Sequence, residues 1–247
     1  MNEALLSLKD IKFSYPESSS PLLDGLCFDL GEEARTGIIG PNGRGKTTLL
    51  HLCVGLVLPD SGEVQFRGRS LQWSEQELFR LRKSVGLCFQ NPEDQLFCPT
   101  VIEDVAFGPL NLGFDRVSAR ERAKWALQLV DMPGFEERVT HKLSGGEKKI
   151  LSLATILSMQ PRAVLLDEPT TGLDPESREH IIQVINSLPQ AMAIVSHDWD
   201  FLARTTSSLY TLDHGQLKET DPGALHQHVH CHPSGSVPHT HQESLEQ

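Results

Sequence analysis

Cysteine is scarce in this sequence, and long apolar runs are absent. The five cysteines are scattered and never form a CxxC pair, which argues against a disulfide framework or a zinc ribbon and favours a reducing compartment. The longest apolar run, LLHLCVGLVLP, lasts about ten residues, which is too short to cross a bilayer. The start, MNEALLSLKD, lacks the basic and apolar regions of a signal peptide. If this protein serves a membrane, we expect it to do so from the side.

Basic residues are also under-represented. The 247 residues include 22 lysines and arginines against 33 aspartates and glutamates, which gives a formal net charge of -11. A protein whose main task is to bind nucleic acid normally has a basic surplus. We therefore expect no nucleic-acid partner, although a local phosphate site is compatible with this balance.

The apolar pattern predicts an α/β fold. Extended stretches are expected over residues 5–15 and 34–40, and the second leads through a glycine-rich turn into a helix whose apolar residues recur from Leu49 onward. Strand patterns return in RAVLLD (162–167) and AMAIVS (191–196). The first and last parts of the chain are thus expected to share one core.

Helix-start signals cluster between these two groups of strands. TVIE (100–103), SARE (118–121) and SGGE (144–147) each place Ser or Thr three residues before Glu, which is the capping-box pattern. DPES predicts a later helix with Asp174 as its cap, and DHG (213–215) predicts a tight hairpin turn. The order predicts an α/β core with a helical insertion.

The glycine-rich turn GPNGRGKTT matches the phosphate-binding pattern GxxxxGK[ST]. Glycines allow successive backbone N–H groups to point inward, and the following helix directs its positive end at the same phosphates. The lysine adds a charge between the outer phosphates, and the threonine hydroxyl completes a magnesium shell. An incidental glycine turn is the alternative. The candidate phosphate-binding residues are Gly40, Pro41, Asn42, Gly43, Arg44, Gly45, Lys46, Thr47 and Thr48.

An acidic pair ends the buried strand pattern AVLLDEP. Asp167 is expected to hold magnesium, and Glu168 to polarise the water that attacks the γ-phosphate in line. The alternative is a solvated acidic pair at a loop, which the phosphate-binding turn disfavours. LSGGE (143–147) is a second anion-ready helix start. One nucleotide does not need two such helix ends from one chain, whereas a dimer that holds the phosphates between two copies does.

With these motifs in place, the chain resembles the ATP-binding-cassette (ABC) family over about residues 5–220. The resemblance implies a P-loop (RecA-like) core with an antiparallel β edge and an inserted helical subdomain. Tyr15 would stack on adenine, although a core-packed tyrosine is the alternative. Gln90 would sense magnesium as a ligand beside Thr47 and Asp167, and His197 would contact the γ-phosphate.

The resemblance also implies contacts with a second subunit. Ser144, Gly145 and Gly146 would bind the nucleotide of the opposite protomer, and Asp174 would lie in the loop that faces it, although Asp174 also suits a helix cap. Position 147 is Glu where the family more often has Gln. We expect Glu147 to reach back to the Ser144 backbone and so to stay away from the phosphate.

The family pattern divides the chain into a cassette and a tail. The ATPase domain is expected over residues 1–225, with its core at 1–90 and 161–220 and its helical subdomain at about 91–160. QNPEDQLF and EDVAFGPLNLG resemble the ATPases of energy-coupling-factor importers, especially the cobalt and nickel branch. That likeness implies ATP and Mg²⁺ as cofactors.

It also implies partners and a location. A second ATPase subunit, identical or a close paralogue, would dock with this one on a transmembrane coupling protein, and a separate membrane protein would capture the substrate. The pair would sit at the cytoplasmic face of the membrane as a peripheral subunit. A vitamin importer, a soluble cassette ATPase outside transport, and a mainly metal-binding protein remain alternatives.

The last residues, 226–247, are rich in histidine. They hold six of the eleven histidines of the chain, and neutral imidazoles are good ligands for nickel or cobalt. The polar, proline-containing composition predicts disorder without metal. Weak opportunistic binding is the alternative to a segment that catches or senses the imported ion. The candidate ligands are His226, His228, His230 and His232.

Overall fold

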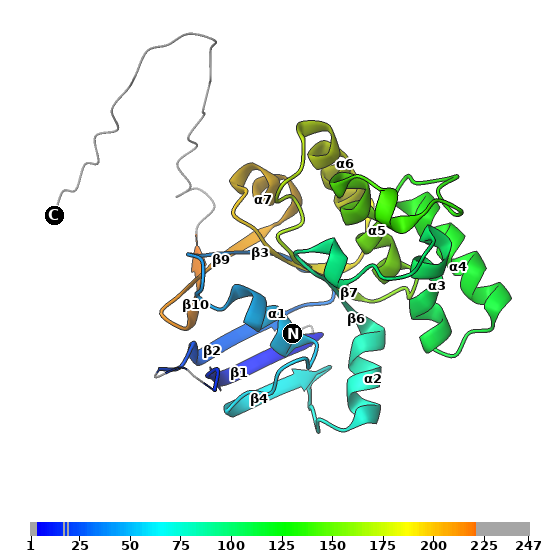
Figure 1. The fold of residues 1–247 in the computed structure, drawn as a ribbon. Coiled ribbons are helices and arrows are strands. Elements are labelled where there is room, and N and C mark those ends of the chain that lie inside the picture. The colour runs from blue at the N-terminus through cyan, green and yellow to red at the C-terminus, as the bar shows by residue number, and fades with distance from the viewer. Residues whose placement is uncertain (1–3, 17, 19, 221–247) are drawn as a thin grey trace, which may run out of the picture.

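Two β-sheets form the frame of the protein in the computed structural model, which describes residues 4–16, 18 and 20–220 (Figure 1). The smaller sheet is antiparallel. Its strands, in order across the sheet, are β2 (Leu23–Leu30), β1 (Leu6–Phe13), β4 (Ser61–Phe66) and β5 (Arg69–Ser70). The strands of the larger sheet, in order, are β10 (Gln216–Thr220), β9 (Ser208–Asp213), β3 (Arg35–Ile39), β8 (Ala191–Val195), β7 (Ala163–Asp167) and β6 (Val85–Cys88).

The larger sheet is parallel except at its β9–β10 edge. The two edge strands are joined by the predicted hairpin turn, in which His214 and Gly215 have φ of 46° and 74°. Both values suit the two-residue turn that matches the twist of the strands. The expected α/β fold with an antiparallel sheet and a helical insertion is confirmed.

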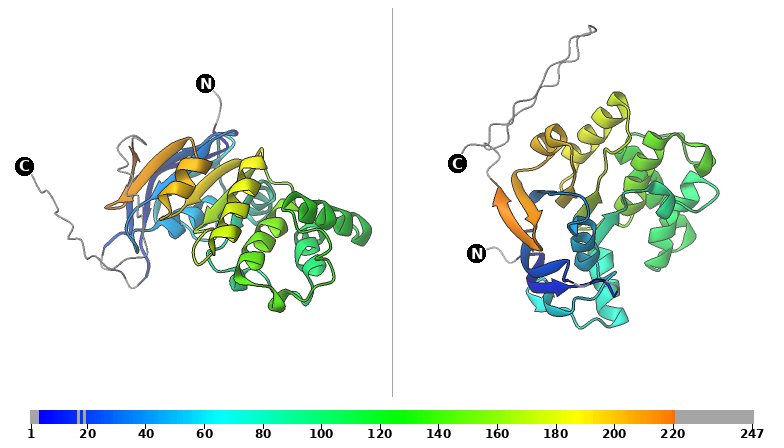
Figure 2. Two further views of the ribbon diagram at one scale, coloured as in Figure 1. Left: turned by 90° about the horizontal axis from the view of Figure 1, so that it is seen from above. Right: turned by 60° about the vertical axis from the view of Figure 1, so that its left-hand side comes forward.

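Both faces of the larger sheet are buried, because successive side chains of a strand point to opposite faces. Along β7, Ala163 and Leu165 join the core that contains the antiparallel sheet and α1 (Lys46–Cys53). Val164 and Leu166 join the other core, which helices on the opposite face of the sheet supply (Figure 2). Those helices include α5 (Gly145–Leu157), α6 (Pro175–Ser187) and α7 (Trp199–Thr205). The sheet therefore lies between two layers, and its strand ends remain free to carry a site.

The helical insertion follows β6 and lies at the end of the molecule remote from β10 (Figure 1). Thr100 and Ser144 form the capping boxes that the sequence predicts. The prediction for SARE is wrong: the fourth helix begins at Arg116, and the Asp115 carboxylate, not Ser118, caps it. The carboxylate accepts hydrogen bonds from two backbone N–H groups of the first turn. The other helices of this region and its approach are α2 (Glu75–Ser84), η1 (Pro92–Asp94), α3 (Val101–Asn111), α4 (Arg116–Leu129) and η2 (Thr140–Lys142).

Some of the predicted features lie outside the described residues. They are the end of the expected ATPase domain, 221–225, and the whole histidine-rich segment with His226, His228, His230 and His232. Among the helices of residues 4–220 that the structure describes, none has the length and apolar character needed to cross a membrane.

Candidate functional site

The turn between β3 and α1 depends on its glycines. A Cβ on Gly40 would approach the Leu212 carbonyl oxygen to 2.3 Å, so only glycine fits there. Gly45 has φ of 97°, in the left-handed region that favours glycine. With this geometry the turn passes close to β9, and the first N–H groups of α1 point into the concave side of the turn.

The Lys46 side chain folds back into this turn. Its ammonium nitrogen lies 2.8 Å from the Gly40 oxygen, 3.1 Å from the Pro41 oxygen and 3.2 Å from His197 Nε2. Burial lowers the pKa of Lys46, and the nearby Glu168 and Asp167 carboxylates oppose that shift. The turn therefore holds a cationic group among acceptors, at the place where the phosphate-binding pattern predicts it.

The two acids at the end of β7 face this turn. Thr47 Oγ1 donates a 2.7 Å hydrogen bond to Asp167 Oδ2, across 120 positions of sequence. Burial raises the pKa of Asp167, and the Thr47 hydrogen bond opposes the rise. Asp167 Oδ1 and Glu168 Oε1 are buried without a hydrogen-bond partner among the described residues. Two unpartnered carboxylate oxygens in one site require a donor or a cation.

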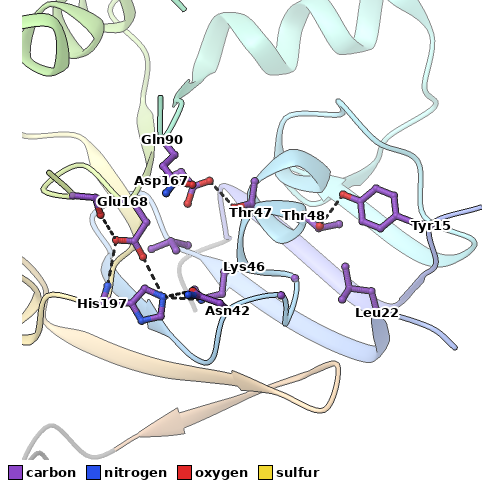
Figure 3. A pocket seen from close by; sticks show the side chains of 14 residues that line it. Tyr15, Leu22, Asn42, Lys46, Thr47, Thr48, Gln90, Asp167, Glu168 and His197 are labelled. Carbon is purple, nitrogen blue, oxygen red and sulfur yellow. Dashed lines mark hydrogen bonds and ion pairs between the residues drawn. The ribbon is translucent and has the colours of Figure 1, made fainter. Parts of the chain in front are cut away.

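Glu168 is held from several sides. Its Oε2 accepts a 3.0 Å hydrogen bond from Thr171 Oγ1 and a 3.4 Å one from the His197 backbone N–H. Its Oε1 lies 3.5 Å from His197 Nε2, which also lies 2.8 Å from Asn42 Oδ1. The Glu168 carboxylate is thus fixed beside His197, two residues after β8, which links it to Asn42 of the phosphate-binding turn (Figure 3).

One cavity of about 500 Å³ joins these side chains (Figure 3). Tyr15 is 47% exposed, so its ring does not pack in a core, and its hydroxyl lies 3.1 Å from Thr48 Oγ1. Gln90 reaches the cavity from the segment after β6. Oxygen atoms of Thr47, Asp167 and Gln90 are the ligand type that Mg²⁺ prefers, so this set fits the cation. The lining residues are Tyr15, Leu22, Asn42, Gly43, Gly45, Lys46, Thr47, Thr48, Gln90, Asp167, Glu168, Thr171, Val195 and His197.

Other predicted residues do not line this cavity. Ser144 caps α5, where its hydroxyl accepts from the Glu147 N–H and the Glu147 carboxylate accepts from the Ser144 N–H at 2.7 Å. Gly145 and Gly146 begin the same helix, and Asp174 caps α6. Those four residues thus lie apart from the cavity of their own chain. In the turn itself, Gly40 and Pro41 contribute carbonyls to Lys46, and Arg44 pairs with Asp213 at 3.6 Å.

The structure adds residues that the sequence did not indicate. Leu22, Thr171 and Val195 line the cavity, but no local pattern marks them. Arg178 in α6 donates to both oxygens of Asp198, at 2.6 and 2.8 Å, and so fixes the residue after His197. Burial alone would raise the pKa of Asp198, but the Arg178 hydrogen bonds and charge, together with the Phe201 N–H, outweigh burial and hold the pKa below its ordinary value.

A parallel sheet that carries a glycine-rich phosphate turn and a strand-end acidic pair defines a P-loop nucleotide-binding protein. The family model described as ABC transporter matches residues 23–171. A putative ABC transporter ATP-binding protein of Nitratidesulfovibrio vulgaris is 52% identical over 237 residues, which cover 96% of this chain and 86% of that protein. The energy-coupling factor transporter ATP-binding protein EcfA of Methanothermobacter thermautotrophicus is 43% identical, covering 86% and 69%. The chain therefore belongs to the ABC transporter ATP-binding family.

Solved structures agree with this assignment. CbiO1 of Clostridium perfringens, part of the ABC transporter complex CbiONQ, superposes with a TM-score of 0.80 at 30% identity and 89% coverage of both chains. The dimeric cassette MJ0796, bound to ADP and phosphate, superposes with a TM-score of 0.79 at 26% identity, covering 88% of this chain and 98% of that one. The protein is an ATPase subunit of an ABC transporter. Its family binds ATP with Mg²⁺ and works as dimers with membrane components.

Proposed function

We propose that this chain is the ATP-hydrolysing subunit of an energy-coupling-factor importer for cobalt or nickel. The observation that carries the hydrolytic role is the hydrogen bond from Thr47 to Asp167, with Glu168 and His197 beside it in one cavity. The importer type is supported by the likeness to EcfA and CbiO1. The protein would act from the cytoplasmic face of the membrane, as a peripheral subunit.

The nucleotide would lie along the cavity from Tyr15 to His197. Tyr15 would stack on the adenine, and the N–H groups of the turn and of the first turn of α1 would bind the phosphates. Lys46 would exchange its carbonyl contacts for the outer phosphates, since its ammonium already lies inside the turn. His197 would donate to the γ-phosphate from the ring nitrogen that now contacts Lys46 and Asn42.

Asp167 would be one of the magnesium ligands, and Glu168 would be the base for hydrolysis. Magnesium, when bound, neutralises charge that develops on the transferred phosphoryl group. Thr47, Asp167 and Gln90 would hold it. Glu168 would accept a hydrogen bond from the attacking water through Oε1, the oxygen that has no partner among the described residues.

Replacement of Glu168 by glutamine tests the base. Glu168→Gln keeps the shape of the side chain but removes the carboxylate, so kcat should fall about 100-fold or more while ATP affinity changes by less than about two-fold. Phosphate release and the binding of a fluorescent ATP analogue measure the two quantities. Turnover at the wild-type rate in Glu168→Gln would exclude Glu168 as the base.

A second ATPase subunit, identical or a close paralogue, would complete the site. Ser144, Gly145 and Gly146 lie at the start of α5 and line no part of the cavity in their own chain. The start of a helix with an exposed serine is suited to a phosphate oxygen. The dimeric state of MJ0796 supports a sandwich in which this helix start meets the nucleotide of the other subunit. Asp174 would lie in the loop that faces that subunit.

Substitution of Ser144 tests this arrangement. Ser144→Ala should lower kcat about ten-fold without weakening ATP binding by the single chain, because the phosphate that Ser144 contacts belongs to the other subunit. Ser118→Ala is the control: this half-buried serine of α4 donates to the Asp115 carboxylate and lines no part of the cavity, so its loss should leave kcat unchanged. Hydrolysis by the purified monomer, at a rate per chain that does not depend on protein concentration, would contradict the sandwich.

The partner in the membrane would dock on a groove between α2 and α3. This groove, of about 650 Å³, is lined by Phe79, Phe97 and Phe107, and the last two rings meet edge to face at 4.7 Å. Phe97 is 65% exposed and Phe107 43%. Phe89, the neighbour of Gln90, also lines it. We infer that short helices of a transmembrane coupling protein occupy the groove, and that a separate membrane protein captures the substrate.

Loss of the Phe107 ring should weaken this docking. Phe107→Ala should reduce the amount of membrane protein that co-purifies with the chain, because exposed aromatic rings supply much of the energy of an interface. Its ATPase rate without the membrane partner should stay within about two-fold of wild type. Trp125→Ala, an exposed aromatic of α4 outside the groove, is the control. Equal co-purification of both variants would exclude this docking site.

Cobalt or nickel as cargo rests on the likeness of QNPEDQLF and EDVAFGPLNLG to the cobalt and nickel branch and on the histidines of residues 226–232. We expect the full chain to bind Ni²⁺ or Co²⁺ near micromolar concentration, and more weakly as pH falls through about 6, because protonated imidazole cannot ligate a metal. Calorimetric titration measures this. Alanine at His226, His228, His230 and His232 should abolish binding and leave ATPase activity intact. Absence of binding by wild type near micromolar concentration would exclude a metal-binding role for residues 226–247.

A further inference from the structure

Lys149 joins the helix α5 to the peptide of Glu168. Its ammonium nitrogen donates a 2.8 Å hydrogen bond to the Glu168 carbonyl oxygen. The side chain is half-buried, next to Cys88 and Leu166. Burial lowers the pKa of Lys149, and the negative groups around it, which include Glu168 and Asp167, oppose the shift. A cation thus contacts the main chain of Glu168 and lies outside the lining of the cavity that Lys46 enters.

The peptide that Lys149 contacts is strained. Glu168 has φ of 47°, in the left-handed region that residues with a side chain seldom adopt. Pro169 follows it, and a residue before proline favours extended backbone. Such strain persists only where the surroundings fix it, and it is common at functional sites. The Glu168 conformation therefore needs external contacts.

Three hydrogen bonds to its main chain hold the Glu168 conformation in place. The Glu168 N–H donates to the Val195 oxygen at 2.9 Å, which ties the residue to β8. The carbonyl accepts two hydrogen bonds, from Lys149 Nζ of α5 at 2.8 Å and from the Thr171 N–H at 3.3 Å. Because Pro169 has no N–H, these two bonds to the carbonyl fix the orientation of the Glu168–Pro169 peptide, and Lys149 makes the shorter of them. Rotation of that peptide would move the carboxylate relative to Thr171 and His197, which it contacts on its other side.

We propose that Lys149 is a positioning residue for hydrolysis, which holds the strained Glu168 peptide so that the carboxylate points into the nucleotide cavity. The inference rests on the proposed role of Glu168 as base. It also gives α5 two tasks, since the helix begins at the Ser144 cap and reaches Lys149 about one turn later. Displacement of α5 relative to β7 would change the Lys149 contact with the Glu168 carbonyl and so the orientation of the Glu168 peptide.

Kinetics of the full chain test this role. At saturating ATP, Lys149→Met should lower kcat about 100-fold, the loss expected when a reacting group is misplaced by about 1 Å. KM and the affinity for a fluorescent ATP analogue should change by less than about two-fold. Lys149→Arg, which can still donate to the carbonyl, should recover about ten-fold of the loss. Lys148→Met is the matched control, because Lys148 pairs with Glu93 and has no contact with the Glu168 peptide; its kcat should equal that of wild type.

A double-mutant cycle separates this inference from the proposed function. A residue that acts through Glu168 has no effect once Glu168 is disabled, so Lys149→Met should cause no further loss in the Glu168→Gln background. A kcat of Lys149→Met equal to that of Lys148→Met, with Glu168→Gln inactive, would overturn the role of Lys149 alone. Full activity of Glu168→Gln would overturn the base assignment itself. Parallel loss of kcat and ATP binding in both Lys149→Met and Lys149→Gln would show a role in the fold only, and would also overturn the proposal.

Discussion

The parallel pairing of β3, β8 and β7 determines where the phosphate-binding turn, the acidic pair and His197 lie. Parallel strands have their carboxyl ends at one edge of the sheet, so the turn after β3, the acidic pair after β7 and His197 after β8 meet there. The sheet can be parallel because both of its faces are covered. Thr47 and Asp167, 120 positions apart, reach hydrogen-bond distance only through this packing.

The same edge concentrates charges that do not stabilise the fold by themselves. Asp167 and Glu168 are buried, and each keeps one oxygen without a partner among the described residues. Burial of a carboxylate costs free energy unless hydrogen bonds or cations offset it. Lys46 and Lys149 approach the pair from two sides, yet both are partly desolvated themselves. The arrangement is therefore better suited to a bound cation and phosphate than to the empty cavity.

The sequence predicted those elements whose signal is local. The glycine turn, the acidic pair, the Asp174 cap and the DHG hairpin each follow from a few neighbouring residues. The helix start predicted at Ser118 of SARE was wrong because Asp115, three residues earlier, offers a carboxylate that accepts from the first N–H groups of the helix. Contacts such as Arg178 with Asp198 are formed by tertiary packing and leave no local pattern.

Lys149 shows most clearly what local sequence cannot predict, because its acceptor is a main-chain carbonyl, which every residue possesses. Neither the lysine nor the Glu168 backbone is marked in the sequence; only the folded chain brings α5 against the end of β7. If the start of α5 meets the nucleotide of a second subunit, the same helix then contacts the base of its own chain. A contact between subunits could in this way reach the base of each one through a single rigid helix, which would make hydrolysis depend on dimer closure without any change within the core of the sheet.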